Sequence, residues 1–165
     1  MLNSNNLRFF SAAKTPTWFW TGQQGLKLDS TLIDDLESYS DLNNTNCRIC
    51  FHKDPSELNH IMLICEKKGM NIPPHYHKNK ADFVFVMRGK LECLEFTEAG
   101  EISNRITLMP GEGYKSEVSQ IHAIAILSDN CIYMESSEGP FVSNSDAHFP
   151  NWAFAWHNYY EASLK

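Results

Sequence analysis

The sequence predicts an all-β fold in a single domain, a small antiparallel β-barrel of the jelly-roll kind with a short N-terminal helix. Three observations support this prediction. From Cys47 onward, β-branched and aromatic residues recur in short runs with a period of two, turn-forming residues separate the runs, and only one earlier stretch has helical spacing. Many short strands at near-regular spacing are typical of a sandwich or barrel.

Length, composition and charge restrict the class of protein. The 165 residues fit one ordinary domain, and a hydrophobic share of 42% is enough for a packed core. The net charge of −6 argues against nucleic-acid binding, because phosphate contacts need clustered Lys and Arg. No apolar run approaches the ~20 residues of a membrane span, and the N-terminus lacks a signal-peptide pattern. We therefore expect a cytoplasmic protein that binds neither nucleic acid nor membrane.

Residues 1–45 are expected to form an N-terminal extension with one helix. Residues 1–27 show no regular pattern and are expected to be irregular. The helix then begins at Thr31, which can cap it, with Asp34 three residues on as in a capping box. Residues 41–44 would end it. Its buried face would carry Leu32, Ile33, Leu36 and Tyr39.

The barrel itself is expected over residues 46–138. The clearest hairpin is 98–101, because Gly100 can take the positive φ that a tight turn requires. Residues 139–165 form an aromatic C-terminal tail with no regular pattern. Its rings should be buried, on the barrel or on a partner subunit in a homodimer. The predicted strands are 47–52, 60–66, 82–88, 90–97, 101–109, 121–127 and 131–135.

The cysteines are expected to have a structural role. An odd number, five, does not suggest a disulfide framework. Cys47 and Cys50 form a CxxC, but a zinc ribbon would need a second pair. Residues three apart on a strand face opposite ways, so we expect these two thiols to pack on opposite faces of the sheet.

Metal-binding chemistry is concentrated in one short segment and two strands. Pro73 and Pro74 hold the following residues extended, so His75 and His77 project from the same face and could bind one ion. Asp82 opens an apolar strand, where a metal, a positive partner or exposure at the strand end would each account for an acid.

His122 begins a second strand of similar type. Taken alone, such a histidine is more often packed in a wall than bound to metal. Three other histidines have no partner spacing and are expected on the surface: His60, His148 and His157.

The spacing of these residues resembles the two sequence motifs of the cupin superfamily. The first motif, G-x5-H-x-H-x(3,4)-E-x6-G, is matched by Gly69, His75, His77, Asp82 and Gly89, with aspartate in place of glutamate. The second, G-x5-P-x-G-x2-H-x3-N, is matched by Gly111 and His122, while Glu117, Ser119 and Ile126 replace the usual Pro, Gly and Asn. The resemblance implies one metal inside a barrel, held by His75, His77, Asp82 and His122.

Within the superfamily, residues 47–154 are most similar to the WbuC-type cupin metalloproteins. The resemblance includes Arg48, His52, the 74–77 segment, residues 88–90, and Gly139-Pro140-Phe141 with Phe149 and Trp152. Genes of that family lie among those for bacterial O-antigen and other surface polysaccharides. The resemblance supplies no reaction. Imidazole and carboxylate ligands suit one divalent ion, and Fe, Mn, Co, Ni and Zn all remain open.

We therefore expect a metal-dependent enzyme, such as an isomerase or epimerase, acting on a sugar or sugar nucleotide in surface-polysaccharide (O-antigen) biosynthesis. Three imidazoles and one carboxylate leave about two positions on an octahedral ion. An iron-dependent dioxygenase would use them for substrate and dioxygen, and a non-catalytic cupin would use them to bind a small ligand.

Details of the site remain open from the sequence. The short side chain of Asp82 leaves open whether it binds the ion directly or only at long range through water, and we expect it to be the weakest contact. Four residues are candidates for the substrate-binding wall: Arg48, His52, Tyr76 and Tyr114.

Overall fold

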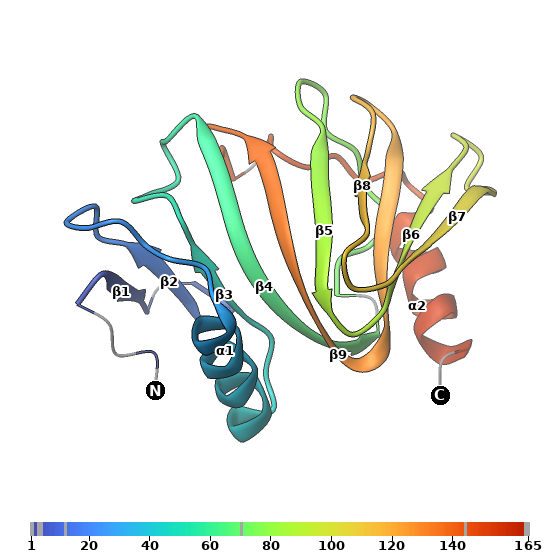
Figure 1. The fold of residues 1–165 in the computed structure, drawn as a ribbon. Helices are drawn as coiled ribbons and strands as arrows, with labels where there is room; N and C mark the ends of the chain where they lie inside the picture. The colour runs from blue at the N-terminus through green and yellow to red at the C-terminus, as the bar shows by residue number, and fades with distance from the viewer. Residues whose placement is uncertain (1, 3–4, 12, 70, 144, 164–165) are drawn as a thin grey trace.

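The computed structural model describes residues 2, 5–11, 13–69, 71–143 and 145–163 (Figure 1). The elements in chain order are β1 (Leu7–Phe10), β2 (Thr17–Trp20), α1 (Ser30–Asn43), β3 (Cys47–Cys50), β4 (Asn59–Gly69), β5 (Asp82–Arg88), β6 (Leu91–Phe96), β7 (Ile102–Leu108), β8 (Gly113–Lys115), β9 (Ile121–Glu138) and α2 (Ala153–Ser163).

The strands form a curved sheet that does not close into a barrel (Figure 1). Its order is β1-β2-β3-β4-β9-β5-β8, and the β6–β7 hairpin attaches to β9. Strands β2 and β3 run parallel, whereas the other paired strands are antiparallel. Within the described residues, no hydrogen-bonded ladder joins β1 or β7 to β8. The fold is therefore mostly β, as predicted, but the sheet stays open.

Strand β9 joins two parts of the sheet, because it bends from one to the other. Its first part pairs with β6, and its second part pairs with β4 and β5. The sequence predicted two strands separated by a turn at 128–130, and this was wrong. The backbone stays extended through the bend, where the N–H groups of Leu127 and Ser128 donate to the Lys90 carbonyl at 2.9 and 3.4 Å.

The N-terminal segment is not irregular, because it contains β1 and β2. Strand β2 adds to the sheet beside β3, and its aromatic residues Trp18 and Phe19 are buried. Helix α1 begins earlier than expected, since Asp29 caps it by accepting the Leu32 N–H at 3.1 Å. It ends at Asn44 in the left-handed conformation, where the sequence placed the end.

Alternation along β3 and β4 gives the sheet two different faces. Cys47, Leu63 and Cys65 point toward α1 and form a core with the fully buried Leu36 of that helix. Cys50 lines the opposite, concave face, as expected for two residues three apart on a strand. All five cysteines are free thiols. Helix α1 thus covers one face and leaves the other face open for a site.

The C-terminal tail contains a helix that the sequence did not predict. Trp152 and Trp156 flank this helix's first turn and pack on Phe96 of β6, with ring centroids 5.4 and 4.7 Å away. The Trp152 indole also donates to the Glu98 carbonyl at 2.9 Å. Two other rings of the tail, Phe141 and Phe154, remain about half exposed. Within the part of the chain that the structure describes, no helix is long and apolar enough to cross a membrane.

Candidate metal centre

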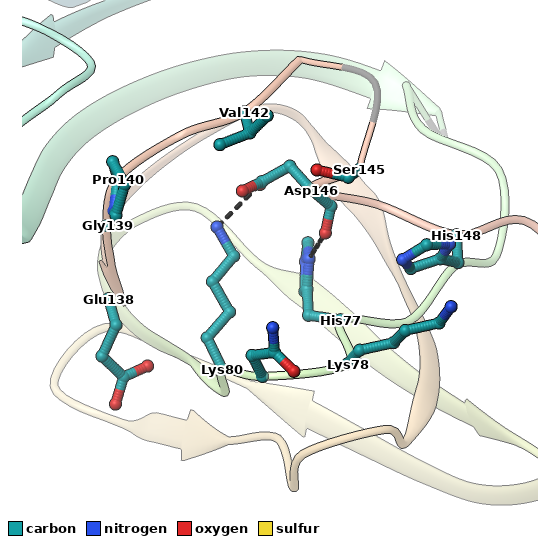
Figure 2. Close-up of a pocket in the computed structure, with 11 residues that line it drawn as sticks. His77, Lys78, Lys80, Glu138, Gly139, Pro140, Val142, Ser145, Asp146 and His148 are labelled. Atoms are coloured by element: carbon teal, nitrogen blue, oxygen red, sulfur yellow. Dashed lines mark hydrogen bonds and ion pairs between the residues drawn. The ribbon is translucent and has the colours of Figure 1, made fainter.

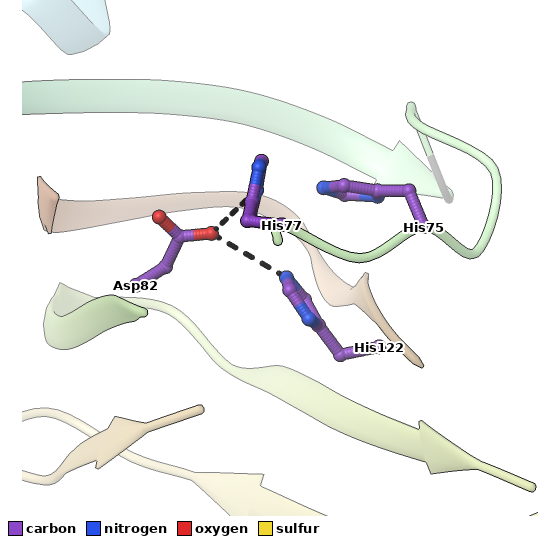
Figure 3. A group of neighbouring side chains, drawn as sticks. All are labelled: His75, His77, Asp82 and His122. Atoms are coloured by element: carbon purple, nitrogen blue, oxygen red, sulfur yellow. Dashed lines mark ion pairs between the residues drawn. The ribbon is translucent and has the colours of Figure 1, made fainter. Parts of the chain in front are cut away.

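Three histidines and one aspartate converge on the concave face of the sheet (Figure 3). His75 and His77 lie between β4 and β5, Asp82 opens β5, and His122 is the second residue of β9. One ligand atom from each residue lies within 4.8 Å of the others. The backbones of His75 and His122 exchange two hydrogen bonds, of 3.0 and 2.8 Å. This bridge brings the two sequence motifs together.

Backbone carbonyls fix the orientation of all three imidazole rings. His75 Nδ1 lies 3.0 Å from the Pro73 carbonyl, and His122 Nδ1 lies 2.9 Å from that of Gln120. His77 Nδ1 lies 2.5 Å from the Asp146 carbonyl. Because a carbonyl can only accept, each Nδ1 must carry the proton. The Nε2 atoms are then the metal-binding nitrogens, the arrangement that orients histidine ligands in metal sites.

Asp82 supplies the negative charge at the centre of the cluster. Its Oδ2 lies 2.9 Å from His77 Nε2 and 3.5 Å from His122 Nε2. Burial acts to raise the pKa of Asp82, but hydrogen bonds from His122 and His77 hold it below its usual range. For His77, burial opposes the charged form, and the bond and charge of Asp82 outweigh it and raise its pKa. Asp82 and His77 therefore stabilise each other's charged form.

This donor set fits a divalent metal ion. An ion can bind between these groups, because the ligand atoms of all four residues lie within 4.8 Å of one another. Burial and the neighbouring His122 lower the pKa of His75 to about 4, so this ring is neutral and ready to coordinate near pH 7. Imidazole and carboxylate donors suit Fe, Mn, Co, Ni and Zn. The residue set does not select among these metals.

The C-terminal tail forms part of this centre. Besides the Asp146 carbonyl on His77, the His148 backbone exchanges hydrogen bonds of 3.0 and 2.9 Å with Tyr76. The Asp146 carboxylate pairs with Lys80 at 2.6 Å, and both side chains are nearly buried. Figure 2 shows this contact in a small cavity of about 380 Å³ behind His77. The tail therefore holds the His75–His77 segment from one side.

A backbone substitution tests this role of the tail. His148→Pro removes the backbone N–H that donates to the Tyr76 carbonyl. We expect metal binding to weaken by roughly 10-fold, which is typical when a contact that supports the metal ligands is lost. His148→Ala keeps the backbone bonds and should bind metal as the wild type does. The measurement is zinc titration of both variants against a chromophoric chelator. Equal affinities in the two variants would show that the tail does not position the ligands.

A cavity of about 750 Å³ opens beside the cluster. Three of the predicted substrate-wall residues, Arg48, His52 and Tyr114, line it together with the four candidate ligands. Tyr76 does not line it. Neighbours on an extended chain point to opposite faces, so Tyr76 turns away from His75 and His77 and stacks on His148, with centroids 5.3 Å apart.

Sequence reasoning missed several residues of the cavity wall. His60 was expected on the surface, but it is 5% exposed and stacks on His52, with ring centroids 4.2 Å apart. Glu135 and Ser137 also line the cavity, from β9. The signal was present in the sequence, because Tyr133, Glu135 and Ser137 alternate at every second position and so share one face of an extended strand.

Comparisons with known proteins identify the fold. A sequence profile described as a domain of unknown function (DUF6016) matches residues 29–108, slightly less than half of the chain. No curated protein sequence matches. Among solved structures, the capsular polysaccharide assembling protein CapF from Staphylococcus aureus superposes with a TM-score of 0.53 at 20% identity, over 62% of this chain and 31% of CapF. Such neighbours are cupin-superfamily proteins. The chain has a cupin fold.

Two other solved cupins match more loosely. KdgF from Halomonas sp. has a TM-score of 0.48 at 15% identity, over 60% of this chain and 82% of KdgF. A variant of oxalate decarboxylase from Bacillus subtilis has a TM-score of 0.48 at 21% identity, over 59% of this chain and 26% of the enzyme. The chain spans less than a third of CapF, and likeness at this level concerns the fold alone.

Proposed function

We propose that this cupin is a metal-dependent enzyme that acts on a sugar or sugar nucleotide. The observation that carries the proposal is the convergence of three Nε2 atoms and one carboxylate on a single point in the wall of a large cavity. His75, His77, Asp82 and His122 would hold one divalent ion there. When bound, the ion would act as a Lewis acid on a ligand oxygen.

The chain's own residues support a small oxygen-rich ligand. Asp82 is ionised and offsets the charge of a cation, while the fixed Nδ1–carbonyl bonds keep the rings from rotating. Arg48 and His52 lie farther along the same cavity and would contact the ligand away from the ion. A cavity of this size, with many charged and hydroxyl-bearing side chains in its wall, is suited to a small polar molecule.

A role in surface-polysaccharide (O-antigen) biosynthesis belongs to this proposal as its more specific part. It rests on the WbuC-type signature, chiefly Gly139-Pro140-Phe141 with Phe149 and Trp152. CapF is itself a capsular polysaccharide assembling protein, which is compatible with that role. In the structure, Phe149 packs next to His75, with ring centroids 5.8 Å apart, so this part of the signature lies at the site rather than remote from it.

Solvent-proton exchange tests the proposed activity. The metal-loaded protein is incubated in D₂O with a panel of hexoses and nucleotide-linked sugars, and deuterium incorporation at carbon or formation of an epimer is followed by ¹H NMR. We expect exchange with at least one panel member, and none with His75→Ala. Stoichiometric iron with oxygen uptake would indicate a dioxygenase instead. Bound zinc or nickel without any turnover would indicate a non-catalytic ligand-binding cupin.

A further inference from the structure

Strand register arranges the concave face in rows that cross β4, β9 and β5. His60, Ser137 and Asp82 are aligned in one row, which contains the metal cluster. The next row contains Met62, Glu135 and Val84. Adjacent strands lie about 4.8 Å apart and successive same-face residues about 6.8 Å apart, so the Glu135 backbone lies within roughly 10 Å of that of Asp82.

Glu135 is an acid with no obvious structural purpose. Its two neighbours in the row, Met62 and Val84, are apolar. Within the described residues, Glu135 forms no ion pair and accepts no hydrogen bond from a side chain, yet it lines the cavity. Glu135 is partly buried, and an acid in such a place without a side-chain partner costs stability, so such groups commonly serve a ligand.

Arg48 is the complementary group on β3. Its register partner is Ile64 of β4, which places it one row beyond Glu135 on the same face. Its Nε donates to the Thr17 hydroxyl at 3.1 Å, and no carboxylate pairs with its guanidinium among the residues that the structure describes. The remaining N–H donors of the guanidinium are therefore available to a molecule in the cavity, which Arg48 also lines.

We infer that Arg48 and Glu135 together bind the hydroxyl groups of a neutral, polyhydroxylated ligand. A hydroxyl both donates and accepts, so neighbouring hydroxyls on one sugar ring can satisfy a donor-only guanidinium and a carboxyl group that do not touch each other. This inference rests on the proposed function. It adds that the part of the substrate that lies beside Arg48 and Glu135 is an uncharged sugar ring.

Two carboxyl groups besides Asp82 line this cavity close to Arg48, those of Glu66 and Glu135. Burial, followed by the charges of Asp82 and Glu66, raises the pKa of Glu135 to about 8. Burial also raises the pKa of Glu66, although Asn71 and Tyr133 hydrogen-bond to it. Both carboxyl groups line the cavity, and a phosphate beside either of them would be repelled wherever that carboxyl is ionised. A neutral hydroxyl-bearing ring would not.

The test compares variants that keep side-chain length but remove the polar groups. Glu135→Met and Arg48→Met are loaded with zinc and titrated with D-glucose, D-galactose, D-mannose and L-rhamnose, and separately with inorganic phosphate, by saturation-transfer NMR. Glu101→Gln and Arg105→Met are matched controls, because both residues are exposed and lie outside the cavity. Zinc content and thermal midpoint are measured for every variant.

We expect the wild type to bind at least one of these sugars, and each Met variant to bind it roughly 10-fold more weakly, which corresponds to one lost hydrogen bond. Zinc content should stay at the wild-type value, and Glu135→Met should melt no lower than wild type. Unchanged sugar binding in both Met variants overturns the inference and leaves the proposed function intact. Binding of phosphate alone, or of no probe by the zinc-loaded wild type, also overturns it. Failure of the proposed function would appear differently, as absence of solvent-proton exchange with every sugar of the panel in the metal-loaded wild type.

Discussion

The double variant His75→Ala, His77→Ala is expected to lose its metal almost completely. Both imidazoles present Nε2 to the centre of the cluster, and their Nδ1 atoms are held by the carbonyls of Pro73 and Asp146. Removing both would leave only Asp82 and His122, and two donors cannot hold an ion tightly. We expect the metal affinity to fall by at least ~100-fold. This is more than the loss that usually follows removal of a residue that only hydrogen-bonds to a metal ligand.

Elemental analysis after dialysis, followed by zinc titration, measures this loss. Lys78→Ala is the matched control, since Lys78 is the exposed residue next to His77 and its removal should leave about one metal per chain. Circular dichroism and the thermal midpoint of the metal-free proteins show whether each variant is folded. A folded double variant that still binds one metal per chain would place the metal elsewhere.

Asp82→Asn is expected to lose as much metal affinity as His122→Ala. The sequence predicted that this aspartate would be the weakest contact, because its side chain is short. The structure instead places its Oδ2 2.9 and 3.5 Å from two of the Nε2 atoms, which supports direct coordination and leads us to revise that prediction. The carboxylate also offsets the charge of a divalent ion in a partly apolar cavity. Asp82→Glu keeps the charge but is one methylene longer, so its affinity should lie between those of wild type and Asp82→Asn.

Two measurements test this expectation. Competitive zinc titration ranks the three variants, and Asp82→Asn binding with near wild-type affinity would show that Asp82 lies outside the coordination sphere. In metal-free protein, NMR titration of His77 gives an independent readout. Because Asp82 raises the pKa of His77, the Asn variant should show a lower pKa at His77, and an unchanged value would mean that the two groups do not interact.

The parts of the fold that follow from local sequence were predictable. Period-two alternation located β3 to β7 with small errors at their ends, and Gly100, with φ of +87°, makes the predicted hairpin turn. The cluster was predictable too, because the His75 and His77 spacing and the positions of Asp82 and His122 carry a recognisable motif. What the structure adds is that the four side chains do converge.

The parts that depend on distant partners were not predictable. Strand β2 has a continuous aromatic run with no alternation, and its pairing with β1 on one side and β3 on the other makes it a strand. Helix α2 lies in a segment whose apolar rings pack on β6 without a clear amphipathic pattern. His60 looked isolated in the sequence because its stacking partner, His52, is brought beside it only by the β3–β4 connection.

The contact between His77 and the Asp146 carbonyl also bears on when the centre can form during synthesis. The ribosome produces His75, His77 and Asp82 early, but His122 and Asp146 follow only after β6 and β7 have been made, and Asp146 only after all of β9. A nascent chain that ends before residue 146 therefore lacks a complete set of oriented ligands. Metal capture should accordingly be a late step that follows synthesis of β9 and the tail, and the emerging histidines should compete weakly for free ions until the tail has docked.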